Sequence, residues 1–225
     1  MLDGGESEDM KGGISICLAA SKGGVGKTTL TTALAVRASQ EAERVAILDL
    51  DPQHSTARWW ELRKKPSNPR LFVGVEDIAD DIDLLKSRGW QWIFIDTPGS
   101  GYEDIMEPAI MASDYILIPV RASAIDVEAI APVADLCRKR RKAYSFVLND
   151  FEAKWKISST AADYLSAHGK VLDVRIHHRQ AHLASMTAGL TGPEYPDRKQ
   201  AKAAAEDIEE LWAFVRRFSM QAARR

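Results

Sequence analysis

The chain has 225 residues, of which 45% are hydrophobic and 28% charged, and its formal net charge is −2 at pH 7. This length is ordinary for a single α/β domain, and the composition excludes collagen-like, disordered and disulfide-scaffold proteins. The two cysteines, Cys17 and Cys137, lie far apart with no ligand cluster near either of them. We therefore expect structural thiols and a reducing compartment rather than a metal–thiolate site.

Charge is divided unevenly along the sequence. Residues 1–137 contain 13 Lys and Arg against 22 Asp and Glu, whereas residues 138–225 contain 17 against 10, which gives net charges of −9 and +7. Such an asymmetry is a hint of a surface for nucleic acid or acidic membrane on the basic part. The acidic N-terminus lacks the features of a secretory signal, and no apolar run approaches the ~20 residues that span a bilayer, so we expect a soluble, cytoplasmic protein.

Apolar runs alternate with helical patterns from Ile14 onward, which is typical of a parallel sheet covered by helices. The predicted strands are 14–20, 44–50, 71–75, 92–96, 115–120, 145–149 and 171–176. The predicted helices are 28–40, 55–65, 77–87, 124–142, 158–168, 179–188 and 197–220. They predict one doubly wound α/β domain at 13–220, mostly parallel and with helices on both faces, between a flexible lead at 1–12 and a flexible tail at 221–225.

A glycine-rich loop, S-K-G-G-V-G-K-T-T at residues 21–29, joins the first predicted strand to the first helix. Glycines in this context let successive backbone N–H groups turn toward a polyphosphate, and the N-terminus of the helix attracts negative charge. Lys27 would contact the β- and γ-phosphates, and the Thr28 hydroxyl would coordinate Mg²⁺. The predicted phosphate-binding residues of this loop are Gly23, Gly24, Val25, Gly26, Lys27, Thr28 and Thr29.

Aspartates close two of the predicted strands. Asp49 and Asp51 point to the same side of the pleat, so one can approach a metal ion while the other orients or deprotonates an attacking water. Asp96 ends the apolar run 92–96, which has the form of a Walker B strand whose acid supports Mg²⁺. The predicted Mg²⁺ ligands are Thr28, Asp49 and Asp96.

The glycine-rich loop departs from the usual pattern G-x-x-x-x-G-K-[ST] at Ser21, and it contains a second lysine, Lys22. It resembles the deviant Walker A motif K-G-G-x-G-K-[ST] of the family that includes the ParA partition ATPases, the MinD cell-division ATPase and the nitrogenase iron protein. The resemblance implies that Lys22, Lys27 and Asp51 are catalytic, and that Lys22 reaches the phosphates of a partner subunit across a nucleotide-sandwich dimer. It also implies that Asn149 reads adenine, although a turn asparagine at a strand end is the alternative.

Residues 51–56 and 118–126 are similar to the small ParA class, which begins directly at the phosphate loop, and the resemblance covers residues 13–218. It implies an ATP- and Mg²⁺-dependent homodimer that binds double-stranded DNA without sequence preference. A ParB-like or other cargo adaptor would stimulate slow ATP hydrolysis, so that a plasmid, chromosome locus or protein cluster is positioned over the nucleoid. The predicted DNA-contacting residues are Arg179, Lys199, Lys202, Arg216 and Arg217, since phosphate contact needs cations but no base-reading motif.

The apolar stripe of the predicted terminal helix allows two interpretations. The stripe Ile208, Leu211, Trp212, Val215 and Phe218 predicts a terminal helix packed on the sheet, whereas a MinD-like regulator would use such a stripe to bind a membrane. The acidic run 206–210 argues against anionic lipid.

Dethiobiotin synthetase and the nitrogenase iron protein suggest two further alternatives for the function. A relative resembling dethiobiotin synthetase would need a small-molecule pocket, and an electron-transfer relative of the iron protein would need paired cysteines that this chain does not provide. His177, His178 and His182 are expected at the surface, without a metal.

Overall fold

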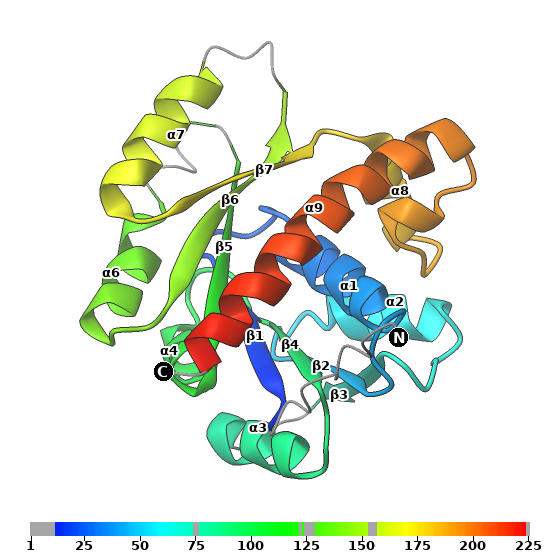
Figure 1. Ribbon diagram of the computed structural model, residues 1–225, viewed down its shortest axis with the longest axis horizontal. Helices are drawn as coiled ribbons and strands as arrows, with labels where there is room; N and C mark the ends of the chain where they lie inside the picture. Colours follow the sequence, from blue (N-terminus) through cyan, green and yellow to red (C-terminus); the bar gives the residue numbers. More distant parts are fainter. Residues whose placement is uncertain (1–11, 74–76, 122, 124–128, 153–156, 224–225) are drawn as a thin grey trace, which may run out of the picture.

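The computed structural model describes residues 12–73, 77–121, 123, 129–152 and 157–223, and the account below concerns these residues. Their strands form one seven-stranded sheet in the order β3-β2-β4-β1-β5-β6-β7, and every neighbouring pair is parallel (Figure 1). The strands are β1 (Ile14–Leu18), β2 (Val45–Asp49), β3 (Arg70–Val73), β4 (Trp92–Asp96), β5 (Tyr115–Arg121), β6 (Tyr144–Phe151) and β7 (Val171–His177). Each corresponds to a predicted strand.

The central strands are apolar because both faces of the sheet are covered. Every residue of β1, β2 and β4 is buried, as expected for parallel strands between two layers of helices. The helices are α1 (Lys27–Ala38), α2 (Ser55–Leu62), α3 (Ile78–Ser87), α4 (Glu103–Ala112), α6 (Ala131–Lys139), α7 (Ile157–His168), α8 (Gln180–Met186) and α9 (Arg198–Ala223). Two buried clusters divide them: α3, α4, α6 and α7 cover one face, and α1 and α9 cover the other (Figure 1). The predicted doubly wound fold is confirmed.

Helix α4 is the main element that the sequence pattern did not predict. Pro108 lies inside this helix, where it removes one backbone hydrogen bond and is expected to break the helix. Met106, Ala109 and Ile110 of the helix are nevertheless buried against the sheet. Packing of an apolar face outweighs the local penalty, since most helical stability in proteins comes from such packing.

The limits of two other helices differ from prediction. Helix α6 begins at Ala131 with Pro132 in its first turn and ends at Lys139, shorter than the predicted 124–142; residues 124–128 lie outside the described part. Arg141, with φ of 55°, has left the helical region. Helix α9 continues to Ala223, into the predicted tail. Apart from Gly12, the predicted lead 1–12 lies outside the described residues, and the domain limits stay a prediction.

The apolar stripe of α9 faces the sheet. Ile208, Leu211, Trp212 and Val215 are almost completely buried, and the Trp212 ring packs edge-on against Trp92 of β4, with 4.7 Å between the ring centroids. The predicted packing of the terminal helix is thus confirmed. Within the described part of the chain, no helix has the length and apolar character needed to cross a membrane.

Candidate nucleotide and magnesium site

The glycine-rich loop lies at the carboxyl end of β1 and leads directly into α1. Gly24 and Gly26 have φ values of 74° and 99°, which favour glycine. Gly26 also lies against Asn149 of β6: a Cβ on Gly26 would be 2.0 Å from the Asn149 Nδ2 atom. Nδ2 itself donates a hydrogen bond to the Val25 carbonyl oxygen at 2.7 Å. Asn149 therefore braces the loop in the free protein, and its predicted contact with adenine stays a prediction.

A cleft of about 600 Å³ opens beside this loop. One wall is the loop and the start of α1, a second is formed by residues from 51–55 and 99–102, and the far wall comes from the ends of β5, β6 and β7 and from α8. The carboxyl ends of strands in an open parallel sheet are where ligands bind. The cleft brings together the predicted residues Lys27, Thr28, Asp51 and Asn149.

Lys27 is buried at the base of the loop, with 7% of its surface exposed. Burial lowers the pKa of its ammonium group, although the charges of Asp96 and Asp51 oppose this effect. Its Nζ donates to the Lys22 carbonyl oxygen at 3.2 Å, and within the described residues no carboxylate lies within 4.0 Å of it. A desolvated cation held by one carbonyl is well suited to receive an anionic ligand such as a phosphate.

Asp96 has the chemistry of a magnesium ligand. Its Oδ2 accepts hydrogen bonds from the hydroxyls of Thr28 and Thr56, each at 2.7 Å. Its Oδ1 is fully buried and has no hydrogen-bond partner among the described residues. Burial raises the pKa of Asp96 to about 7, against the opposing hydrogen bonds from Thr56 and Thr28. A buried, half-satisfied carboxylate beside a threonine hydroxyl fits Mg²⁺, which prefers oxygen ligands and would neutralise the charge.

Asp49 lies opposite Asp96 in the register of β2 and β4. Burial raises its pKa, and both of its oxygens already accept backbone hydrogen bonds: Oδ1 from the N–H of Asp51 at 3.2 Å, and Oδ2 from the N–H of Ala57 at 2.9 Å. The carboxylate thus ties the end of β2 to the first turn of α2. These hydrogen bonds do not themselves indicate a metal ion at Asp49, so its predicted contact with Mg²⁺ stays a prediction.

Asp51 lines the cleft, as its predicted role requires. Its Oδ1 accepts a hydrogen bond from the Gln53 N–H at 2.9 Å, which closes a local turn after β2. Lys22 is half-buried and is not among the described residues that line the cleft. The loop beside it is in close contact with Gly99, where a Cβ would lie 3.1 Å from the Gly23 nitrogen. The predicted action of Lys22 on a second subunit is not tested by one copy of the chain.

The far wall of the cleft holds residues whose role the sequence did not reveal. Arg179, predicted to contact DNA, donates two hydrogen bonds to the buried carboxylate of Asp207 on α9, and its side chain is 25% exposed, so the DNA contact stays a prediction. His182 is also buried, with 5% of its surface exposed, so the expectation of a surface residue is wrong there; His177 and His178 are half-exposed. Asp207 lies on the buried face of α9 with Ile208 and Leu211. An acidic residue within such an apolar stripe could have predicted a buried partner for its carboxylate.

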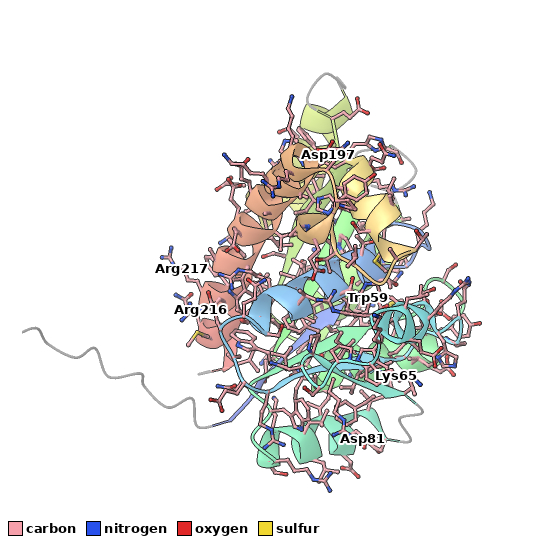
Figure 2. The ribbon with its side chains drawn as sticks, turned by 90° about the vertical axis from the view of Figure 1, so that its right-hand side faces the viewer. Trp59, Lys65, Asp81, Asp197, Arg216 and Arg217 are labelled. Carbon is pink, nitrogen blue, oxygen red and sulfur yellow. The ribbon has the colours of Figure 1, made fainter. Side chains whose placement is uncertain are left out.

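The remaining predicted DNA-contacting residues lie on α9. Lys199 and Lys202 are exposed near its start, and Arg216 and Arg217 are exposed near its end. Figure 2 shows both arginines projecting outward from the helix, far from Asp197 at the other end. At 1.5 Å per residue, the two pairs are about 25 Å apart along the axis, so they form two separate basic sites rather than one. Arg216 lies 3.3 Å from Glu41, which partly neutralises it.

Three comparisons with known proteins agree with this geometry. Residues 16–213 match the domain described as the CobQ/CobB/MinD/ParA nucleotide binding domain. Maintenance of carboxysome distribution protein A from Halothiobacillus neapolitanus is 25% identical over 205 residues, which covers 88% of this chain and 94% of that relative. The chromosome-partitioning ATPase Soj of Thermus thermophilus is 26% identical over 145 residues, which covers 52% of this chain and 58% of Soj. The MinD cell division protein of Aquifex aeolicus has a similar structure, with a TM-score of 0.70 at 18% identity, over 89% of this chain and 97% of MinD.

Proposed function

The chain belongs to the CobQ/CobB/MinD/ParA family of nucleotide-binding domains, whose ParA and MinD members are P-loop ATPases, and on this premise we propose that it is an ATP-driven positioning switch. Two copies would close around ATP and Mg²⁺, and the closed dimer would bind DNA without sequence preference. A partner protein on a cargo would then stimulate hydrolysis, which reopens the dimer and releases the DNA. The relatives are named for carboxysome distribution and chromosome partitioning, which supports a positioning role.

The observation that carries the proposal is the Oδ1 atom of Asp96, which has no hydrogen-bond partner in the described part of the chain. This buried oxygen lies at the end of β4, and the other oxygen of the same carboxylate already holds the hydroxyls of Thr28 and Thr56. Such a group is costly unless it meets a cation. Thr28 and Asp96 would hold Mg²⁺, and the bound ion would neutralise charge on the phosphate oxygens.

The other side chains around the cleft would bind the phosphates and activate the attacking water. Lys27 would bind the β- and γ-phosphates, exchanging the Lys22 carbonyl for a phosphate oxygen. Asp51 would orient the attacking water and accept its proton. Asp49 would hold the segment that carries Asp51 through the backbone hydrogen bonds described above, and its predicted contact with Mg²⁺ remains part of the proposal.

Lys22 would complete the site only when a second copy docks. A lysine supplied from a partner stabilises the charge that develops in the transition state, so hydrolysis depends on dimer formation. Intrinsic turnover would then be slow, and the conformational change would be the useful product.

The proposed DNA surface consists of Lys199, Lys202, Arg216 and Arg217, and Arg179 is left out because its guanidinium is paired with Asp207. Contacts of this kind are sequence-independent and weaken steeply with salt. We do not propose the membrane-associated alternative, since the apolar stripe of α9 is buried against the sheet rather than available to lipid. Cytoplasmic, nucleoid-associated localisation follows from DNA binding and is part of the proposal.

One experiment separates nucleotide binding from hydrolysis. Lys27→Ala should abolish binding of a fluorescent ATP analogue, whereas Asp51→Ala should bind it normally, lose ATP hydrolysis and accumulate as an ATP-dependent dimer in light scattering. Lys65→Ala, which removes an exposed lysine away from the cleft (Figure 2), is the control for general charge loss. An Asp51→Ala protein with full hydrolysis would contradict the assigned role.

DNA binding needs its own measurement. ATP-loaded protein should bind an arbitrary DNA duplex at low salt in an anisotropy titration, and the Lys199→Ala, Lys202→Ala double variant should bind it more weakly. The matched control is Lys64→Ala, Lys65→Ala, which removes the same charge from exposed positions after α2. Absence of binding by the ATP-loaded protein, or equal loss in both double variants, would contradict the proposed surface.

A further inference from the structure

A second hollow, of about 800 Å³, lies between α3 and α4 beside the end of β2. We call it the α3–α4 groove. One long side is a face of α4 formed by Asp104, Ile105, Pro108, Met111 and Ala112, whose spacing places them along a single stripe of the helix. Met111 on this stripe is 43% exposed although its neighbours on the opposite face of α4 are buried in the core. Ile105 and Ala112 pack partly against the core, whereas Pro108 and Met111 form an exposed apolar edge of the stripe that the described chain leaves uncovered.

The groove has a consistently acidic rim. Asp77 and Asp104 line it at the surface, Asp49 lies buried in its wall, and no Lys or Arg is found among the described residues that line it. The first turns of the two adjacent helices add Asp80, Asp81 and Glu103, and Figure 2 shows Asp81 pointing outward from α3. An apolar floor with an acidic border fits a ligand that is apolar along one face and cationic along its edges.

Charge excludes several other occupants. Phosphate-rich surfaces, such as DNA or an anionic membrane, would be repelled by the carboxylates at the rim. Residues 1–10 of this chain contain four acidic side chains and no Lys or Arg, so they lack the charge to fit the rim. These exclusions leave a basic, partly apolar protein segment as the occupant that the groove favours.

The groove shares a wall with the catalytic segment. Leu50, Pro52 and His54 line it, and Asp51, which lies between them, lines the nucleotide cleft on the other side. Asp49 contributes to the groove and also holds the Asp51 N–H. A ligand seated on Leu50 and Pro52 therefore touches the segment that carries the proposed catalytic carboxylate.

We propose that the α3–α4 groove docks a short segment of the stimulating partner that presents Lys or Arg beside apolar residues, and that docking fixes the 49–54 segment in its hydrolytic position. This inference rests on the proposed function, because it assigns a place to the partner of the ATPase cycle. The segment would lie along the apolar stripe of α4 with its cations beside Asp77 and Asp104. Helices that bind grooves in this way use an apolar face with periodic anchors.

The test uses the full chain with ATP and Mg²⁺ and a synthetic probe. The probe is a peptide of about 14 Leu and Lys residues in helical periodicity, and its counterpart carries Glu in place of Lys. Methionine methyl groups are labelled with ¹³C, and the Met111 signal is assigned by its disappearance in Met111→Leu. We expect the Lys peptide, but not the Glu peptide, to shift the Met111 signal saturably and to raise ATP hydrolysis.

Two pairs of variants test whether the peptide binds in the α3–α4 groove. Asp104→Lys should weaken peptide binding by about tenfold, because it reverses a charge at the rim, whereas Asp83→Lys makes the same change at an exposed position of α3 outside the groove. Met111→Ser should also weaken binding, and Leu84→Ser is its control, because Leu84 is equally exposed at 43% but does not line the groove. Thermal melts establish that each variant is folded.

Several results would overturn the proposal: no binding up to about 1 mM peptide, binding without a shift of Met111, equal binding by the Asp104→Lys and wild-type proteins, or equal binding of the Glu peptide. A Met111 shift that depends on protein concentration without peptide would assign the groove to a second copy of the chain instead. Fluorescent ATP binding in the same samples keeps the two proposals distinct. Normal ATP binding without peptide binding contradicts the groove alone, whereas loss of ATP binding by the wild type contradicts the proposed function.

Discussion

Asp207 of α9 and Arg179, which precedes α8, are joined by two hydrogen bonds from the guanidinium group to the carboxylate, at 2.7 and 3.0 Å. The same carboxylate accepts a hydrogen bond from the His177 N–H at 3.1 Å and lies 2.8 Å from His177 Nδ1. Burial opposes ionisation of Asp207, but the His182 ring, whose Nε2 lies 3.5 Å away, and the hydrogen bonds from Arg179 and His177 outweigh it and hold its pKa well below the usual range. One buried charge thus fastens the last helix to the far wall of the nucleotide cleft.

Replacing Asp207 with Asn should destabilise the fold, because Arg179, whose side chain is only 25% exposed, would lose its charged hydrogen-bond partner on α9. We expect a loss of about 2–4 kcal/mol, and a melting temperature lower by roughly 5–15 °C for a chain of this size. Glu210→Gln, at an exposed position of the same helix, is the control and should melt like the wild type. An Asp207→Asn protein as stable as the wild type would show that the pair contributes nothing.

The pH dependence of this effect follows from the lowered pKa of Asp207. The carboxylate is more acidic in the folded than in the unfolded state, so its stabilising contribution is complete above the unfolded pKa of about 3.9 and is lost as pH falls through the folded pKa. The stability difference between the wild type and Asp207→Asn should therefore be constant near neutrality and shrink below about pH 4. Urea unfolding at a series of pH values measures it, and a difference that grows on acidification would contradict the assignment.

The contact between Gly26 and Asn149 gives a second prediction. Gly26→Ala should damage the phosphate loop for two reasons, since the new Cβ meets Asn149 Nδ2 and the φ of 99° is strained for alanine. Combining it with Asn149→Ala removes the clash but leaves the backbone strain, of about 1–2 kcal/mol. We expect nucleotide binding to be lost in Gly26→Ala and partly restored in the double variant. Gly101→Ala, where φ is also positive but a Cβ meets nothing within 4 Å, is the control.

Asp96→Asn tests the magnesium site. In the wild type, Mg²⁺ added with ATP should raise the melting temperature, and EDTA should reverse the rise, because a bound ligand stabilises only the folded state. Asparagine preserves an acceptor for Thr28 and Thr56 but has no charge to offer the metal. The effect of Mg²⁺ should therefore disappear in this variant and persist in Asp135→Asn, which lies on α6. A full Mg²⁺ response in Asp96→Asn would contradict the assignment.

Trp212 anchors α9 through its contact with Trp92, and truncation should expose how much the helix depends on it. The side chain is 2% exposed, and its Nε1 donates to Glu41 at 3.1 Å. Trp212→Ala should cost about 3–5 kcal/mol of unfolding free energy in a urea titration. Trp60→Ala, which removes a half-buried ring at the edge of the same cluster, should cost less. Equal losses would mean that α9 is held mainly by other contacts.

The sequence predicts those features of the fold and the site that depend on residues close together in the chain. Each of β1, β2 and β4 is a short apolar run that ends at a glycine-rich loop or an aspartate, so the strand and the functional residue that follows it are encoded together. Parallel pairing then brings those strand ends to one edge of the sheet. For this reason the amino-acid sequence alone predicts that Lys27, Thr28, Asp51 and Asp96 lie close together, as they do, whereas their roles stay predictions.

Contacts between residues that are far apart in the sequence could not be predicted in this way. Arg179 and Asp207 are 28 positions apart, and an arginine that binds a carboxylate has the same sequence signature as one that binds a phosphate. Thr56 was missed because its hydroxyl matters only through Asp96, 40 positions away. Helix α4 was missed because Pro108 is a local breaker whose penalty is offset by burial against the sheet.

The two layers of helices separate the two proposed partners in space. Helix α9, which carries Lys199, Lys202, Arg216 and Arg217, packs on the same face of the sheet as α1, whereas α3 and α4, which border the acidic groove, cover the other face. A polyanion and a cationic segment would therefore approach opposite faces of the molecule, and neither would compete with the other for the same surface.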